Sequence, residues 1–182
     1  QLIKRQFNCD VKGLHSDRGG ELLNGILEFF CTEHGIIHTT TTAYTPHRNG
    51  LAEGTNGILI VTSRAIMVHA NAPPILWGEG LVTGGYLRNR QKIKKLNGKS
   101  SYGMAHKTEP SLKRLRVWGC DAYVHIENTN NSKFQPVKTP GIFIGYSKQQ
   151  YAYRIQLAND TVYISKNVIF TENSFKFMAI FH

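Results

Sequence analysis

The chain has 182 residues, which is enough for one domain or two small ones with a proper hydrophobic core. Its 22 Lys and Arg against 12 Asp and Glu give a formal net charge of +10, which favours a polyanionic partner. Three scattered cysteines exclude a disulfide framework and a four-cysteine zinc site, and there is no signal-peptide pattern or bilayer-length apolar run. We therefore expect an intracellular protein, nuclear or cytoplasmic, that is not secreted and has no membrane partner.

The first predicted element is a short strand around Val11 and Leu14. This strand brings Asp17 to its carboxyl end, which is where open α/β sheets place their sites. Gly19 and Gly20 allow the tight turn that follows.

A helix is predicted from Glu21 to His34, with Gly35 as its C-cap residue. The pattern of Cys31, His34 and His38 does not predict zinc, because Gly35 should break the helix between the histidines and no fourth ligand is near. The apolar residues of this helix recur with the spacing of one helical face: Leu23, Ile26, Leu27 and Phe30.

The next elements alternate between strand, loop and helix. A short strand from Ile36 to Thr40 leads into a polar loop from Thr41 to Asn49. A helix then carries Glu53 and ends at His69, and a further helix runs from Ile75 to about Arg90. The basic stretch that follows, residues 91–113, is either a nucleic-acid contact or a solvated linker.

Beyond a composition shift near residues 109–112 the apolar pattern changes to short β-branched and aromatic runs. Turn residues separate these runs, which favours a small β-barrel. The barrel's most prominent aromatic residues could form a binding surface, but burial preferences favour the core. They are Trp118, Tyr123, Phe143 and Tyr146. The runs cover residues 115–126, 139–147, 153–158 and 161–170.

Two carboxylates stand out by their flanking residues. Asp17 lies in SDRGGE and Glu53 lies in YTPHRNGLAEGTNG, with 35 residues between the two acids. When a phosphodiester is cut or joined, negative charge on the attacking and leaving oxygens must be stabilised. Metal ions held by carboxylates provide this stabilisation. The alternative is that Asp17 is an ordinary turn residue and Glu53 an ordinary acid near a helix start.

This spacing and wording resemble the second Asp and the Glu of the DDE triad in integrases of copia-type (Pseudoviridae) long-terminal-repeat retrotransposons. Two later wordings, LWGEG and GGYLRNR, resemble the same family in the same order. The runs LRVWGCDAYV, GIFIGYS and VYISKNVIF resemble the SH3-like domain that follows the catalytic core in the Gag-Pol polyprotein. The resemblance implies an α/β, ribonuclease H-like integrase core lacking its first strands, followed by a small all-β SH3-like barrel.

By this resemblance, residues 1–109 are the partial catalytic core, residues 113–172 are the SH3-like domain, and residues 173–182 are unassigned. The implied activity is DNA integration by polynucleotidyl transfer, with Asp17 and Glu53 as catalytic residues and as ligands of Mg²⁺ or Mn²⁺. The implied partners are DNA, both element ends and target, and a complete integrase subunit. The candidate nucleic-acid contacts are His47, Arg48, Asn49, Asn56, Lys92, Lys94 and Lys95.

Two departures from the family bear on activity. Only 16 residues precede Asp17, so the family's first catalytic Asp and its N-terminal zinc module are absent, and we expect little activity from the chain alone. Glycines stand where the family has basic or helix-forming residues, and they suggest a decaying copy of a mobile element. The alternative functions are a non-catalytic module that binds nucleic acid or protein, and a remnant without function. The glycines concerned are Gly54, Gly57, Gly78, Gly80, Gly84 and Gly85.

Overall fold

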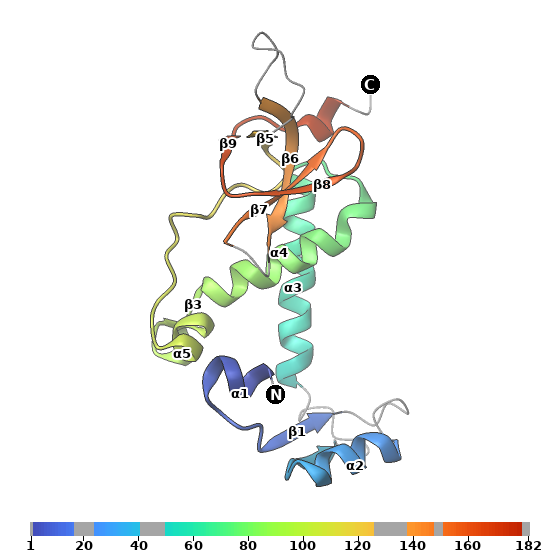
Figure 1. The fold of residues 1–182 in the computed structure, drawn as a ribbon, viewed down its shortest axis with the longest axis vertical. Coiled ribbons are helices and arrows are strands. Elements are labelled where there is room, and N and C mark those ends of the chain that lie inside the picture. Colours follow the sequence, from blue (N-terminus) through green and yellow to red (C-terminus); the bar gives the residue numbers. More distant parts are fainter. Residues whose placement is uncertain (1, 17–23, 41–49, 126–137, 148–150, 180–182) are drawn as a thin grey trace. The chain divides into compact units, whose positions relative to one another are not determined.

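The computed structural model describes residues 2–16, 24–40, 50–125, 138–147 and 151–179 (Figure 1). The chain divides into two compact units, Gln1–Gly57 and Ile58–His182. Helices and a parallel strand pair are followed by a five-stranded antiparallel sheet, which confirms the predicted order of an α/β part and an all-β part. Within the described ranges, no helix is both long and apolar enough to cross a membrane.

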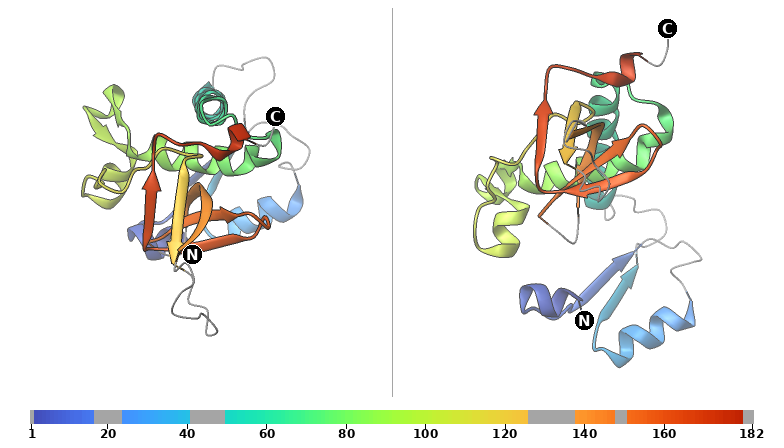
Figure 2. Two further views of the ribbon diagram at one scale, coloured as in Figure 1. Left: turned by 90° about the horizontal axis from the view of Figure 1, so that it is seen from above. Right: turned by 45° about the horizontal axis from the view of Figure 1, so that its top comes forward.

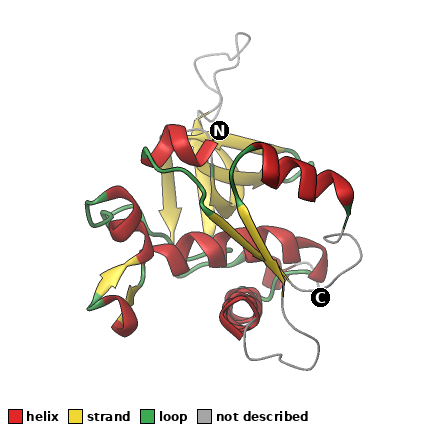
Figure 3. Ribbon diagram, turned by 90° about the horizontal axis from the view of Figure 1, so that it is seen from below, coloured by secondary structure: helices red, strands yellow, loops and turns green. Residues whose placement is uncertain are grey.

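The first unit contains a two-stranded parallel sheet with short helices beside it (Figure 3). Both strands were predicted, and a hydrogen bond of 2.9 Å between Ser16 Oγ and His38 Nε2 joins their side chains. The last of its elements, the helix over residues 50–69, continues into the second unit. The elements are α1 (Leu2–Phe7), β1 (Gly13–Ser16), α2 (Gly25–Glu33), β2 (Ile37–Thr40) and α3 (Gly50–His69).

Helix α2 differs from its prediction at its start and on its apolar face. It begins at Gly25 and not at Glu21, because the Asn24 side chain accepts a hydrogen bond of 2.8 Å from the Leu27 N–H and caps the helix. Its end is as predicted, since Gly35 follows with a φ of +63°. On the expected apolar face, Ile26 is 82% exposed and Phe30 is 48% exposed, whereas Leu27 is half-buried; Leu23 lies outside the described residues.

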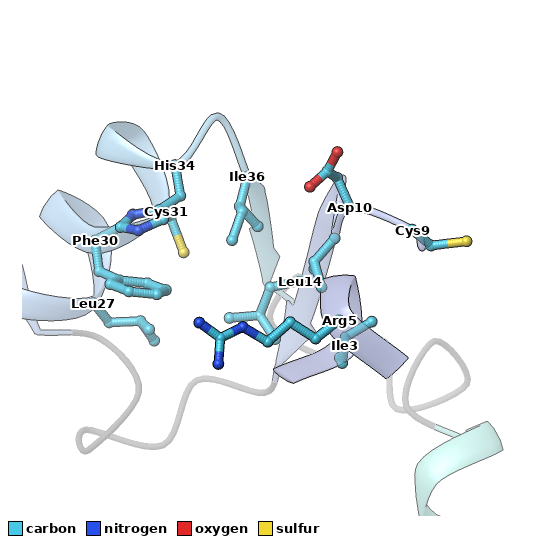
Figure 4. Close-up of a pocket in the computed structure, with 11 residues that line it drawn as sticks. Ile3, Arg5, Cys9, Asp10, Leu14, Leu27, Phe30, Cys31, His34 and Ile36 are labelled. Atoms are coloured by element: carbon cyan, nitrogen blue, oxygen red, sulfur yellow. The ribbon is translucent and has the colours of Figure 1, made fainter. Parts of the chain in front are cut away.

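An apolar cavity of about 950 Å³ lies among α1, β1, α2 and β2 (Figure 4). Leu27 and Phe30 of α2 and the guanidinium of Arg5 point into it, whereas the thiol of Cys9 points away. Asp10 is the one carboxylate among the described residues that line it, so this lining does not offer the set of carboxylates that Mg²⁺ prefers.

Helices form the first half of the second unit. The stretch predicted as a possible solvated linker is instead a β-hairpin and a helix. Its turn residues Asn97 and Gly98 adopt φ values of +53° and +76°. Ser100 caps the helix and donates a hydrogen bond of 2.8 Å to the Glu109 carboxylate. The elements are η2 (Pro74–Leu76), α4 (Trp77–Arg90), β3 (Lys92–Ile93), η3 (Lys94–Leu96), β4 (Lys99–Ser100) and α5 (Ser101–His106).

Two of the glycines in α4 lie where this helix crosses α3 (Figure 1). A Cβ atom on Gly80 would lie 2.8 Å from Ser63 Oγ, and one on Gly84 would lie 3.6 Å from the Leu59 carbonyl oxygen. Both glycines are buried. Their missing side chains therefore allow the two backbones to approach closely, which gives these two glycines a packing role. The hypothesis of a decaying copy stays a prediction.

Five antiparallel strands form the second half, in the order β8-β7-β6-β5-β9. The predicted run at residues 161–170 divides into two strands at a turn, where the Asn167 N–H donates to Ser165 Oγ over 3.1 Å. The second of these strands pairs with β5 at the far edge (Figure 2). The strands are β5 (Asp121–His125), β6 (Lys138–Tyr146), β7 (Tyr153–Leu157), β8 (Val162–Ser165) and β9 (Val168–Thr171).

This strand order requires the sheet to curl. In a flat sheet the two edge strands would be four spacings apart, about 19 Å. The connection from Ser165 to Val168 has three Cα–Cα steps, which reach about 11 Å at most. The sheet therefore closes on itself as the predicted small barrel.

Three of the four prominent aromatic residues are buried, as predicted, namely Trp118, Phe143 and Tyr146, whereas Tyr123 is half-buried and belongs to neither cluster of buried residues. Phe143 is fully buried, and Tyr146, Tyr153 and Phe170 pack around its ring. A second cluster joins Trp118 to Phe177, which lies in η4 (Lys176–Ala179) and so ties the C-terminal tail, unassigned by its sequence, to the unit.

Helix α4 packs directly on β6. Thr83 Oγ1 lies 3.4 Å from the Ile144 carbonyl oxygen, and Gly145 has no side chain to obstruct this contact. An ion pair of 2.5 Å between Glu79 and Arg154 adds a link to β7. The helices that follow residue 57 therefore share one compact unit with the barrel, and the predicted boundary near residues 109–112 lies inside it.

Candidate nucleic-acid and metal site

Glu53 lies in the first turn of the 20-residue helix α3 and is exposed. In the described ranges, no hydrogen bond or ion pair holds its carboxylate. The helix therefore presents an available carboxylate at the position that the sequence predicted.

Asp17 lies outside the described residues, so its proximity to Glu53 stays a prediction. The strand that was predicted to lead to it is confirmed, since β1 ends at Ser16. β1 and β2 are parallel, so their carboxyl ends lie at the same edge of the sheet. In α/β folds this edge is the usual location of a site.

Among the predicted nucleic-acid contacts, Asn56 is exposed on α3. It is three residues beyond Glu53, so both side chains lie on the same face of the helix. The loop residues His47, Arg48 and Asn49 lie outside the described part of the chain.

The predicted lysines form a basic hairpin in the second unit. Lys92 lies in β3, and Lys94 and Lys95 lie in η3; all three side chains are exposed. Lys99 in β4 is exposed as well. No carboxylate in the described ranges forms an ion pair with these lysines, so their charges are available to a polyanion.

The described residues contain no group of three or more His, Cys, Asp and Glu side chains that could hold a metal ion. The residues of the rejected zinc pattern have other surroundings. Cys31 is buried, His34 Nδ1 is 3.0 Å from the Phe30 carbonyl oxygen, and His38 is bonded to Ser16.

A second cavity, lined by arginine and tyrosine side chains of the second unit, was not predicted. The sequence contains one signal for it, the i, i+4 spacing of Tyr86 and Arg90 in a predicted helix. The other lining residues come from distant segments, which no local pattern connects.

The chain is similar in sequence to segments of known polyproteins. The model of the family "Retroviral polymerase SH3-like domain" matches residues 120–180. The chain is 32% identical over 179 residues to the Retrovirus-related Pol polyprotein from transposon TNT 1-94 of Nicotiana tabacum, covering 98% of this chain and 14% of that protein. It is 33% identical over 177 residues to the corresponding polyprotein from transposon RE1 of Arabidopsis thaliana, covering 97% of this chain and 12% of that protein.

A solved structure also matches, that of a simian T-cell lymphotropic virus intasome in complex with PP2A regulatory subunit B56 gamma. The identity is 20% and the TM-score 0.46, with 86% of this chain and 56% of that chain covered. The sequence relatives confirm the resemblance that the motifs indicated. The chain is therefore homologous to the integrase region of copia-type retrotransposon Pol polyproteins, and residues 120–180 correspond to the SH3-like domain.

Proposed function

We propose that the chain is part of an integrase that inserts element DNA by polynucleotidyl transfer, with Asp17 and Glu53 as ligands of a divalent metal ion. The observation that carries this proposal is the homology, which extends over 97–98% of the chain. The relatives are much longer, since the chain spans 14% and 12% of their lengths. We therefore propose the activity for the longer protein, to which a chain like this one would contribute one segment.

The chemistry of the available ligands fits Mg²⁺ or Mn²⁺. Both ions accept carboxylate oxygens, and Mg²⁺ keeps several water ligands, so a site with few protein ligands suits it. Glu53 supplies an exposed carboxylate on a rigid helix. When bound, the metal would stabilise charge on the oxygens of the phosphodiester.

Exposed basic residues support DNA as the partner. The hairpin lysines are placed to neutralise phosphates, a contact that gives affinity without base specificity. Asn56, on the same helix face as Glu53, could hold the strand near the metal. Because its partner is DNA, we propose that the protein works in the nucleus or cytoplasm.

The test measures Mn²⁺ binding to the chain by calorimetry, and the joining of oligonucleotides that carry element ends. We expect Glu53→Gln and Asp17→Asn each to weaken Mn²⁺ binding about tenfold or more, because even outer-shell partners of a metal contribute that much. Both variants should also abolish any joining activity.

The matched control is Glu28→Gln. Glu28 is an exposed acid in the first turn of α2, so this change removes the same charge from the same helical position. Equal Mn²⁺ affinity in the wild type and in all three variants would refute the proposed metal site.

The basic hairpin specifically favours a second candidate function, a nucleic-acid-binding module without catalysis. In that case DNA binding should weaken steeply as salt rises, and it should not depend on metal or on Glu53. Replacing Lys92, Lys94 and Lys95 by Gln should lower the slope of log affinity against log salt by about 0.9 for each phosphate that these lysines neutralise. If the slope changes in this way and does not depend on metal, the result favours the binding module over the enzyme.

A further inference from the structure

The unpredicted cavity has a volume of about 530 Å³ and lies between the helices and the barrel of the second unit. This volume is in the range of small-molecule sites. Four segments contribute to it: helix α4, helix α5, the stretch before β5, and the residues at the end of β6 and just before β7. The side chains that carry the argument are Tyr86, Arg90, Tyr102, Arg114, Tyr146 and Tyr151.

Aromatic and guanidinium planes form a stack at the buried end of the cavity. The Tyr86 and Tyr146 rings are stacked with centroids 3.8 Å apart and an interplanar angle of 13°. The Arg90 guanidinium carbon lies 3.4 Å from the Tyr86 centroid. Because both neighbours are so close to one ring, they must lie on its opposite faces. The stack is therefore rigid and already formed.

Arginine and tyrosine side chains also meet at the exposed end. The Arg114 guanidinium carbon lies 5.0 Å from the Tyr151 centroid, and Tyr151 is 75% exposed. The Tyr102 centroid lies 5.0 Å from the Arg90 guanidinium carbon. A side-chain hydrogen bond between Tyr102 and Tyr151 raises the pKa of Tyr102, so this hydroxyl stays neutral and keeps its proton.

The charge of the cavity is positive and uncompensated. Among the described residues, its lining includes two arginines and no acidic residue. Among the described carboxylates none pairs with Arg90 or Arg114, whereas Arg116 and Arg154 of the same unit pair with Glu172 and Glu79. Arg90 uses one N–H to bind the Tyr86 carbonyl oxygen, which leaves most of its five donors available.

We propose that this cavity binds an unpaired nucleotide of a DNA strand, with the base against the exposed ring of Tyr151 and the phosphate on Arg90 and Arg114. The proposal rests on the proposed function, in that it specifies which part of the DNA the second unit holds. Aromatic rings and guanidinium planes are the surfaces on which unstacked bases are bound, and arginine is the preferred partner of phosphate.

The arrangement selects an unpaired nucleotide over a duplex. In a duplex the faces of each base are covered by its neighbours, so a ring in a cavity cannot stack on it unless the base leaves the helix. The lysines of the basic hairpin, by contrast, can bind phosphates whether or not the bases are paired. The amide of Asn89, which also lines the cavity, can donate and accept hydrogen bonds at a base edge.

The experiment measures the affinity of the 182-residue chain for three labelled probes by fluorescence anisotropy. The probes are a short oligothymidylate, an abasic strand of the same length, and a duplex. We expect Tyr151→Ser and Arg114→Gln each to weaken oligothymidylate binding about fivefold or more, with duplex affinity nearly unchanged. Tyr151→Phe, which keeps the ring, should bind oligothymidylate nearly as well as the wild type.

Two control variants lie outside the cavity. Lys166→Gln removes one exposed positive charge, and Phe29→Ser removes an aromatic ring that is 70% exposed. Both should bind oligothymidylate like the wild type. Because Tyr151 is exposed, its replacement should leave the melting temperature unchanged.

The outcomes separate this proposal from the proposed function. If the duplex binds but the cavity variants match their controls, or if the abasic strand binds as tightly as oligothymidylate, the cavity is not a nucleotide site and the proposed function stands. If the wild type binds none of the three probes, both proposals fail.

Discussion

Cys120 and Tyr146 hold ionisable protons inside the core of the barrel. Burial raises the pKa of the Cys120 thiol from 9.0 to about 12, and the charges of Glu172 and Asp121 contribute to this rise. Burial likewise raises the pKa of the Tyr146 hydroxyl from 10.0 to about 12. In both cases the folded protein keeps a proton that the unfolded chain would release at a lower pH.

This difference makes stability depend on alkaline pH. Above about pH 9 the unfolded thiol ionises while the folded thiol does not, so stability should fall by about 1.4 kcal/mol per pH unit for each such group. We expect unfolding by urea to need less denaturant as pH rises from about 9 to about 11. Cys120→Ala should reduce this slope, whatever its effect on stability at neutral pH. An unchanged slope would contradict the assignment.

At the scale of the element, α4 carries glycines with opposite expected effects. A Cβ atom on Gly78 would meet nothing within 4 Å, whereas one on Gly80 would lie 2.8 Å from Ser63 Oγ and 3.2 Å from Met67. Both residues are in the helix, so alanine should help its backbone equally at both positions. The two positions therefore differ in their surroundings: Gly80 lies at the crossing with α3, and Gly78 does not.

We therefore expect Gly78→Ala to stabilise the protein by up to about 1 kcal/mol. Gly80→Ala should be less stable than Gly78→Ala by about 1–3 kcal/mol, because the added methyl group overpacks the crossing. Urea denaturation of the two variants measures the difference. Equal stabilisation by both would show that Gly80 has no packing role, and the hypothesis of decay would regain its support.

At the scale of the whole molecule, the two units differ in how much they bury. Among the described residues of the first unit, Ser16 and Cys31 are buried, whereas the second unit has two clusters of buried apolar residues. Since apolar burial is the main favourable term in folding, the second unit should be the more stable. Local opening should therefore cost less free energy in the first unit than in the second.

Hydrogen exchange measures this difference directly. We expect the amides of β5, β6 and β7 to be the most protected, because these strands surround the fully buried Phe143. Amides of α1 and α2 should exchange faster by orders of magnitude. Equal protection in both units would contradict this ranking. A cooperative melt of the second unit at ordinary mesophile temperatures would also argue against a decayed element.

Local sequence patterns were enough to predict most elements and the family. Val11 and Leu14 indicated β1, the spacing after Glu53 indicated α3, and Gly35 marked the end of α2. These features depend on backbone preferences and on short motifs, which the local sequence contains. The same motifs carried the resemblance that the relatives confirm.

Contacts between distant segments could not be read in this way. The fold revealed that Gly80 and Gly84 serve a helix crossing, that β9 closes the barrel against β5, and that Phe177 belongs to the core. It also joined Tyr86 to Tyr146 across 60 positions in one stack. Such contacts arise from packing between elements, so they depend on the three-dimensional arrangement and leave no periodic signal in the sequence.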